Sequence, residues 1–509
     1  MLELSKVFIY FLVQQAAVVL FSLARSKALA AYTGVGGFGL ISQANSLVLT
    51  FQVILGAGLG SGFVKLIAEH AEKGDTQRRS QVASAVFAVG SLLGITGVLI
   101  AALFSRTIST WVFSSPDNAG YVLISVFTAF IVFQYMFFLN LFRGLLEWKI
   151  YTLVSILSTA VSLIVTFALI AFFNIDGGVW ALLASQVGSL LVAGCFFWFN
   201  IRKRHAVIFW GGIHSRKVLR LLLANIGPLL IIQIFTSLSS LATRSMVIST
   251  LGLAQNGLVQ LSTGISDSYM GLIFALLLSY ILPKIAATIA KDPQGARQTQ
   301  NDGLRFCLLI ITPFLVVLLA TREIWIPLLY SRAFLAAQGI LIWQFLGDFF
   351  LVIRRCLNID LVPTRRFGYL SLDGSLFAAG MIALSVMLLP VIGVYAVSVT
   401  SLILNFSLTV FSLLFHQRST DFRLNQASRT VLVKSFVLLC AGFAAAIWIP
   451  GLLTRALAVS LVLVLMLVLL PKTGELQKIW REVLPGIIRQ GQLNLREEID
   501  STTDVSSMD

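Results

Sequence analysis

The chain has 509 residues, of which 58% are hydrophobic and only 12% are charged. A soluble globular protein carries about 25% charged residues, so this composition predicts an integral membrane protein. Each spanning helix needs roughly 20 apolar residues, and about fourteen such helices would leave no second soluble domain. A large catalytic ectodomain is therefore excluded. The net charge of +15 could indicate nucleic acid in a soluble chain, but its distribution predicts no nucleic-acid partner here.

Apolar stretches alternate with polar connections along the chain. In order they fall near 6–30, 39–67, 81–104, 120–142, 150–173, 178–200, 218–242, 253–283, 303–321, 334–353, 368–390, 393–415, 432–449 and 452–470. The sequence predicts an all-α polytopic fold of about fourteen transmembrane helices, or twelve if the last two stretches form a re-entrant hairpin. The stretch from Val7 to Leu23 is long for a signal-peptide core and is followed by basic residues, so we interpret it as the first retained span.

The basic residues gather in alternate connections. One set of connections, including those at Lys73–Arg79, Arg143–Lys149 and Arg202–Arg220, contains most of the chain's 37 lysines and arginines. Cytoplasmic loops retain positive charge, so this asymmetry predicts that both termini are cytoplasmic and that the number of spans is even. The connection near Ser105 to Gly120, predicted on the opposite side, is too short for a domain.

A faint internal repeat predicts two lobes. Gly39-Leu40-Ile41 opens the second span as Gly257-Leu258-Val259 opens the eighth, and a lysine closes each span at a similar distance. Parallel repeats of this kind occur in transporters. We expect an N-terminal six-helix lobe at 1–201, a cytoplasmic linker at 202–217, a C-terminal six-helix lobe at 218–416, two extra helices at 417–470 and a cytoplasmic tail at 471–509.

Glycines mark two places in the first lobe. Gly34 to Gly39 matches the GxGxxG pattern of dinucleotide sites, but a membrane span precedes it, so a flexible connection between two helices is the better interpretation. Gly56, Gly58, Gly60 and Gly62 within the second span predict a bend or a close helix contact.

Charges inside apolar spans are the candidate functional residues, because each costs several kcal/mol in lipid unless it faces a wet cavity or a partner. Arg25 shares a face with Gln14, while Lys27 lies about 200° around the helix, so one of the two cations could instead reach toward a helix end. The alternative to a functional role is that these charges form structural ion pairs between helices, such as Arg25 with Asp267. The full set predicted to bind substrate is Arg25, Lys27, Arg143, Arg354 and Arg355, and the set predicted to couple ions or balance charge is Asp267, Asp348 and Asp373.

A cavity with more cations than carboxylates suits an anionic substrate, because arginine grips phosphate oxygens bidentately. The carboxylates could bind H⁺ or Na⁺ and link transport to an ion gradient. No cofactor is expected. The four cysteines form no metal pair, and the histidines His70, His205, His214 and His416 are predicted in polar connections without a ligand cluster, so no metal site is expected either.

Several separated motifs carry a resemblance to a known family. They are Tyr32-Thr33-Gly34 through Gly39-Leu40, Gly56-Ala57-Gly58, Val64-Lys65, Gly264-Ile265-Ser266-Asp267-Ser268-Tyr269, Tyr280-Ile281-Leu282-Pro283 and Trp343-Gln344-Phe345-Leu346-Gly347-Asp348. In this order they resemble the Wzx-type polysaccharide flippases of the multidrug/oligosaccharidyl-lipid/polysaccharide exporter superfamily. The likeness extends over roughly residues 5–415.

The resemblance implies two six-helix bundles around a central cavity, alternating access and no enzymatic activity. The implied substrate is an undecaprenyl-pyrophosphate-linked oligosaccharide, of lipid III or O-unit type, carried to the periplasmic leaflet of the bacterial inner membrane. Implied partners are membrane lipid, a polysaccharide polymerase and a chain-length regulator. The extra segment from Val431 to Leu470 departs from this pattern and resembles the fourteen-span lipid II flippases.

Four alternatives stay open at this point. A lipid II flippase would fit the fourteen-span plan, although the Arg-Asp combination of that family's first helix is absent beside Arg25. A multidrug antiporter for cations would favour a cavity of carboxylates and aromatics, and this one is predicted to be net positive. A membrane glycosyltransferase or polymerase would need an acid/base or metal constellation, and a scaffold without transport activity is the remaining alternative.

Overall fold

The computed structural model describes residues 2–56, 59–204, 216–289, 291–419, 422–449, 459–460 and 464. Every regular element in these ranges is helical, which confirms the predicted all-α class. The longer helices are α1 (Leu2–Leu55), α2 (Leu59–Glu72), α3 (Thr76–Phe113), α4 (Ala119–Gly144), α5 (Trp148–Phe196), α7 (Arg216–Leu251), α8 (Leu253–Leu276), α10 (Pro293–Ala320), α12 (Gln338–Leu357), α13 (Phe367–Ile392), α14 (Ala396–Ser419) and α15 (Gln426–Trp448). Shorter helices are α6 (Arg202–Arg204), α9 (Leu282–Thr288) and α11 (Arg322–Leu329).

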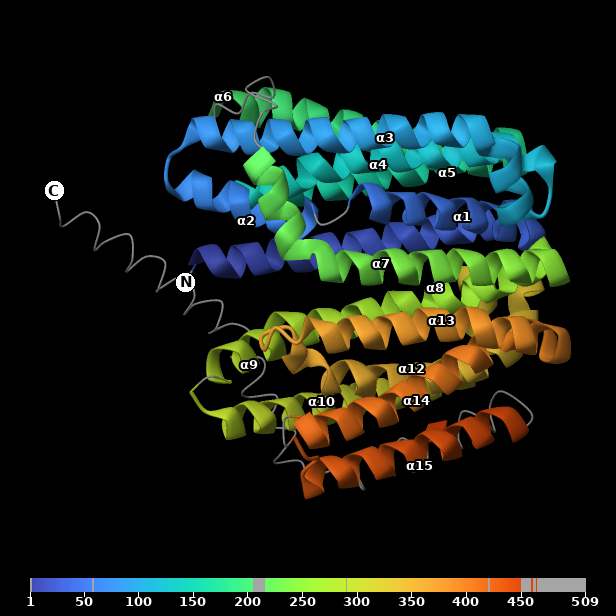
Figure 1. Cartoon of the computed structure of the whole chain (residues 1–509). Coiled ribbons are helices and arrows are strands. Elements are labelled where there is room, and N and C mark those ends of the chain that lie inside the picture. The colour runs from blue at the N-terminus through green and yellow to red at the C-terminus, as the bar shows by residue number, and fades with distance from the viewer. Residues whose placement is uncertain are drawn as a thin grey trace.

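Two of the helices each contain a sharp turn. A straight helix as long as α1 would measure about 81 Å, far more than the ~30 Å of a bilayer's hydrocarbon core. At Gly34 the backbone has φ 66° and ψ −173°, a conformation essentially reserved for glycine, and α1 doubles back (Figure 1). In α5 the break lies at Asn174, with φ 50°. Each helix therefore contains two of the predicted spans, and the flexible connection predicted at Gly34–Gly39 is instead a single-residue turn inside helical structure.

The described chain has eight helical segments that are long and apolar enough to cross a membrane. Segments 13–55, 148–201 and 367–419 each cover parts of two predicted spans, so the protein is a multi-pass membrane protein. Helices α7 and α8 contain many hydroxyl, amide and charged residues, and the cavity described below lies against both.

One of the predicted segments is corrected by the structure, and three others lie largely outside the described residues. The connection predicted at Ser105 to Gly120 is largely helical, because α3 continues to Phe113 before a left-handed residue at Ser114 ends it. Most of the predicted linker at 202–217, nearly all of the last predicted span at 452–470 and the whole tail at 471–509 lie outside the described residues. The choice between twelve and fourteen spans therefore stays a prediction.

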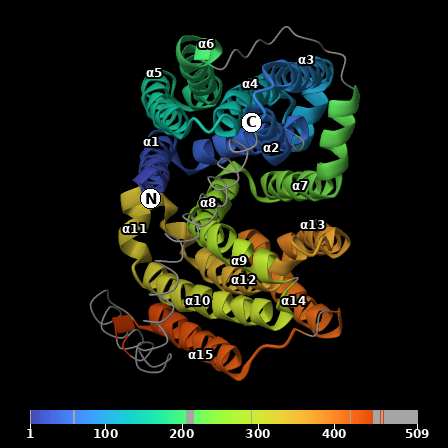
Figure 2. The same ribbon diagram turned by 90° about the vertical axis from the view of Figure 1, so that its left-hand side faces the viewer.

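The helices form two groups that lie side by side (Figures 1 and 2). We name α1–α6 the first helix group and α8–α15 the second helix group; α7 lies along the boundary between them. One end of the assembly carries the turns at Lys73–Arg79, Arg143–Lys149 and Arg365–Arg366, and we call it the basic end (left in Figure 1). The predicted topology makes the basic end cytoplasmic.

The two groups meet most closely where α1 crosses α8. A Cβ on Gly39 would lie 2.0 Å from the carbonyl oxygen of Leu253, and a Cβ on Gly257 would lie 2.2 Å from that of Val35. Each glycine thus meets the residue one helical turn before the other glycine. The Nδ2 group of Asn256 also donates to the carbonyl oxygen of Gly39 at 2.9 Å. Equivalent positions of the predicted repeat therefore form a near-symmetric contact that residues with a Cβ would push apart.

Candidate functional site

A cavity of about 560 Å³ lies among α7, α8, α12, α13 and α14, within the range of sites that hold small molecules. It runs from the C-terminal turn of α12, at the basic end, to the second half of α7 and the first turns of α14. The site residues that the sequence predicted and that line it are Asp267, Asp348, Asp373, Arg354 and Arg355. Residues from distant parts of the sequence are thus brought together inside the second helix group.

The face of α7 that borders the cavity is made of short polar side chains. Thr236, Ser240 and Thr243 follow one another at helical spacing and all line the cavity. Most hydroxyls in such helices donate to a carbonyl oxygen one turn earlier, as Thr236 does to Ile232 at 2.9 Å. The repeated hydroxyl residues within this predicted span were the sequence signal available for a cavity-lining helix.

Arg354 lies in the last turn of α12, where the helix dipole favours a cation. Its Nε atom is 3.9 Å from Oδ2 of Asp373, a separation that gives charge attraction without a hydrogen bond. The guanidinium stacks over the ring of Phe377 at 4.9 Å. Among the described residues, Nε and Nη1 of Arg354 and Oδ1 of Asp373 are buried without a hydrogen-bond partner. The neighbouring Arg355 lies over the ring of Phe274 at 5.6 Å and is exposed to the cavity.

Asp348 is held differently, because its carboxylate is 1% exposed and fully hydrogen-bonded. Ser266 donates to it at 2.6 Å, Gln344 donates at 3.0 Å, and the Tyr269 hydroxyl donates as well. These bonds join α8 to α12. A carboxylate satisfied by neutral donors can stay charged without a neighbouring cation, so Asp348 fixes the geometry of the cavity wall.

Arg244 is the cavity residue that sequence reasoning undervalued. It was not among the predicted site residues, because it lies near the end of its predicted span, where a cation could belong to the rim; it nevertheless lines the cavity. Its guanidinium donates to Ser46 of α1 at 2.9 Å and to Thr263 of α8 at 3.0 Å, and it also donates to Gln260. Arg244 therefore links the cavity to the first helix group. Asp267 lines the same cavity with an exposed side chain.

The three cations predicted from the first helix group lie elsewhere. Arg25 donates to Ser162 of α5 at 3.0 Å, not to Asp267, and Gln14 donates to Ser155 on the same helix at 2.9 Å. The predicted shared face of Arg25 and Gln14 is therefore confirmed, and it packs against α5. Lys27 is exposed and donates to the carbonyl oxygen of Leu328 in α11.

Arg143 is exposed near the basic end of α4, where its guanidinium lies 5.8 Å from the centre of the Tyr151 ring. None of Arg25, Lys27 and Arg143 is among the described residues that line the cavity. The structure thus divides the predicted site: the second helix group gathers its share of the charges in one place, and the first group does not.

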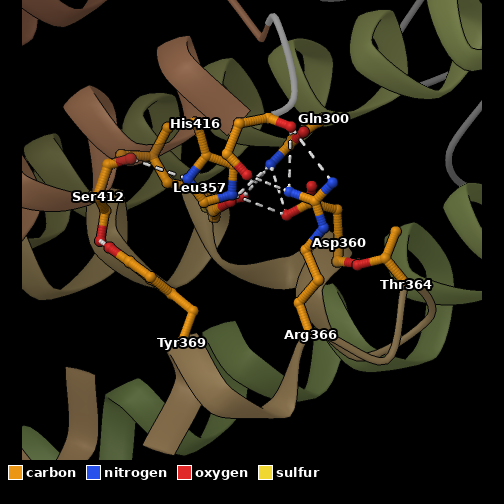
Figure 3. Close-up of polar contacts among 10 residues, drawn as sticks. Gln300, Leu357, Asp360, Thr364, Arg366, Tyr369, Ser412 and His416 are labelled. Atoms are coloured by element: carbon orange, nitrogen blue, oxygen red, sulfur yellow. Dashed lines mark hydrogen bonds and ion pairs between the residues drawn. The ribbon is translucent and has the colours of Figure 1, made fainter. Parts of the chain in front are cut away.

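A polar cluster at the basic end supports the end of α12 (Figure 3). His416 was predicted in a polar connection, but it lies within α14 and is completely buried. Its Nε2 is 3.0 Å from Oδ1 of Asp360, and its Nδ1 is 2.8 Å from the carbonyl oxygen of Ser412. Gln300 of α10 donates to the carbonyl oxygen of Leu357 at 2.7 Å. The cluster therefore fixes the C-terminus of α12, which carries Arg354 and Arg355.

The arrangement defines a multi-pass membrane protein with a charged cavity among its helices. The fold is similar to that of a multidrug resistance MATE family transporter of the MOP superfamily, solved in an inward-facing conformation, with a TM-score of 0.68 and 15% identity over 79% of this chain and 94% of that one. It is also similar to the lipid II flippase MurJ, with a TM-score of 0.67 and 16% identity over 90% and 97% of the two chains.

Sequence comparison specifies the family within this class. The chain matches the family described as polysaccharide biosynthesis protein over residues 5–338, about two thirds of its length, and it belongs to that family. It is 24% identical to the lipid III flippase of Escherichia coli K12 over 335 residues, covering 63% of this chain and 76% of the relative. The family match ends where α12 begins, so Arg354, Arg355 and Asp373 lie beyond it.

Proposed function

We propose that this protein is a flippase that moves an undecaprenyl-pyrophosphate-linked oligosaccharide, of lipid III or O-unit type, from the cytoplasmic to the periplasmic leaflet of a bacterial inner membrane. The family and the relative named lipid III flippase support this choice of substrate class. The concentration of Lys and Arg at the basic end supports cytoplasmic termini and entry of the headgroup from that side.

The observation that carries the proposal is the state of Arg354. Its side chain is buried in a membrane-embedded cavity, and two of its N–H groups have no acceptor among the described residues. An arginine in this position is costly unless an anion completes its hydrogen bonds. A pyrophosphate supplies oxygens that a guanidinium can bind in pairs. With Arg355 beside it, Arg354 is the proposed anchor for the pyrophosphate, while the prenyl chain stays in lipid.

Alternating access is part of the proposal, and the crossing of α1 and α8 supports it. This contact lies toward the end of the molecule opposite the basic end, because Gly39 and Gly257 follow closely after the turns at Gly34 and Gly252. Release of the headgroup on that side requires the two backbones to separate. The glycines permit a tight closed contact without interlocking side chains, so the crossing is the proposed moving element.

Coupling to H⁺ or Na⁺ is part of the proposal. A gradient supplies ~2.3 kcal/mol per charge per 100 mV, enough to bias the two conformations. Asp267 is the best candidate for the coupling group, because its carboxylate is exposed in the cavity. Asp373 balances Arg354, and Asp348 is occupied by neutral donors.

A multidrug antiporter for cations is the competing function, and the MATE-like fold favours it. Among the described residues, the cavity is lined by three arginines, Arg244, Arg354 and Arg355, and by three carboxylates, Asp267, Asp348 and Asp373, so the predicted excess of cations is not found. The equal numbers of positive and negative groups still give a cationic drug no net attraction to the cavity.

Proteoliposomes separate these two functions. The purified protein is reconstituted with a fluorescent prenyl-pyrophosphate-linked oligosaccharide in the outer leaflet, and its movement inward is followed by quenching from outside. A parallel set of vesicles is loaded with a cationic dye. We expect protein-dependent movement of the lipid and no protein-dependent efflux of the dye; the opposite pattern would refute the flippase.

A further inference from the structure

A second cavity, of about 510 Å³, lies in the first helix group and is separate from the charged cavity. It is formed by α3, α4 and α5 together with a π-helical turn at Phe197–Ile201 that continues α5. Its wall is aliphatic and aromatic, with Gln134 and Cys195 as the exceptions, and it is open along one side. We call it the apolar groove. Its composition suits a hydrocarbon chain.

The apolar groove faces the outside of the helix assembly. Two of its aromatic side chains, Trp198 and Phe199, are 58% and 77% exposed, and Leu191 is 64% exposed. Helices α3, α5 and α6 lie on the side of the first helix group that is remote from the second group (Figure 2). In a membrane, apolar side chains at such a position contact lipid. The occupant of the apolar groove must therefore come from the bilayer.

Cations lie at the mouth of the apolar groove. The guanidinium of Arg202 is exposed and lies 4.0 Å from the centre of the Trp198 ring, a cation–π contact. Two residues further on, Arg204 forms an ion pair at 3.0 Å with Glu147, which belongs to the Arg143–Lys149 turn of the basic end. Arg202 therefore lies at the basic end, where the predicted topology places the headgroups of the cytoplasmic leaflet.

We propose that the apolar groove binds an anionic phospholipid of the cytoplasmic leaflet, with one acyl chain along the groove and the phosphate on Arg202. Basic residues beside a groove between membrane helices favour anionic headgroups. The groove has the volume of a site for a small ligand, and the long undecaprenyl chain of the proposed substrate exceeds it. The groove shares no lining residue with the charged cavity, so the proposal is independent of the proposed function.

Cys195 makes occupancy of the apolar groove measurable, because it lines the groove and is exposed. Cys440 is also exposed but lies on α15, outside the groove, and Cys307 and Cys356 are buried. The full-length protein in nanodiscs is treated with N-ethylmaleimide, and peptide mass spectrometry gives the rate at each cysteine. Adding phosphatidylglycerol to phosphatidylcholine nanodiscs should slow the modification of Cys195 several-fold and leave that of Cys440 unchanged.

Two variants test the parts of the apolar groove separately. No atom lies within 4 Å of the Cβ position of Gly194, so Gly194→Leu fills the groove without a clash and should abolish the effect of phosphatidylglycerol on Cys195. Gly97→Leu is its control, because the Cβ position of Gly97 is equally open and lies outside the groove. Arg202→Gln should raise the fraction of phosphatidylglycerol needed for half-protection by about fivefold. Arg106→Gln, at an exposed position elsewhere on α3, should leave it unchanged.

Three results would overturn the lipid site. The first is equal slowing of Cys195 and Cys440, which would show a general effect of membrane charge. The second is protection of Cys195 that is absent in the original protein or persists unchanged in Gly194→Leu. The third is a Cys195 that stays unreactive in detergent without phospholipid, which would mean that part of the chain, such as residues 205–215, covers the groove.

Discussion

The two helix groups, which contain the two copies of the predicted repeat, differ in where their charges lie. In the first group, Arg25 bonds to a serine hydroxyl of α5, and Arg143 is exposed near the basic end. In the second group, Arg354 and Asp373 lie 3.9 Å apart in the wall of the cavity and keep unpaired polar atoms among the described residues. The first group thus consists mainly of packed helices, whereas the second group contains the charged cavity. The substrate contacts are accordingly proposed in the second group, and the following experiments test that asymmetry.

The largest effect is expected for Arg354→Gln. The change removes the buried cation that is proposed to hold the pyrophosphate, so lipid movement in proteoliposomes should fall about tenfold or more. Arg332→Gln is the matched control, since Arg332 is exposed outside the cavity. If the two variants were inserted into the membrane in equal amounts and moved the lipid equally fast, the proposal that the second group binds the substrate would be wrong.

The next effect is expected at the contact shared by both groups. Gly39→Val would place side-chain atoms against the carbonyl oxygen of Leu253, so the crossing of α1 and α8 must open. Transport should fall several-fold, and a cysteine placed at the buried Ser245 should react faster with a water-soluble thiol reagent. Gly97→Val is the control, because no atom lies within 4 Å of its Cβ position. Unchanged transport and thiol reactivity in Gly39→Val would show that the crossing does not move.

A stability effect is expected from Asp348→Leu. Ser266, Tyr269 and Gln344 would lose their acceptor, which should lower the free energy of unfolding by about 2 kcal/mol. Adding Tyr269→Phe removes one of the stranded donors, so the double variant should lose less than the sum of the two single variants. Thermal unfolding in detergent measures both. Strict additivity would mean that these bonds do not act together.

The smallest effect is expected in the first group. Arg25→Gln removes a hydrogen bond to Ser162 and leaves the described cavity intact, so lipid movement should change by no more than about twofold. The same flipping assay measures it beside Arg354→Gln. A loss of lipid movement as large as that of Arg354→Gln would place Arg25 in the substrate site, and the proposal that substrate contacts lie in the second group would be wrong.

The contrast between apolar stretches and charged residues allowed both the helices and several of the cavity charges to be predicted from the sequence. A charge within an apolar stretch is costly, so Asp267, Asp348 and Arg354 stand out in a single sequence. Arg244 was not predicted as a site residue, because a cation near the end of a span could equally reach the membrane surface. His416 was misplaced, because its segment is followed by polar residues and its partner, Asp360, comes from another part of the chain.

Neutral polar residues were beyond prediction. A serine or threonine in a helix usually satisfies itself on its own backbone, so Thr243 looks the same in sequence as Thr236. Only packing shows that Thr236 has a carbonyl partner and that Thr243, among the described residues, has none. Asn405 is similar, because its Nδ2 reaches Ser401 while its oxygen stays unpaired.

The amino-acid sequence by itself determined that this chain is helical and spans a membrane, and it marked the glycines where the two groups meet. Those features depend on local properties: hydrophobic length, the cost of charge in lipid and the absence of a Cβ. The tertiary structure alone decided which charges share a cavity and which polar atoms remain unpaired. Both depend on the directions that side chains take once helices distant in the sequence have packed together.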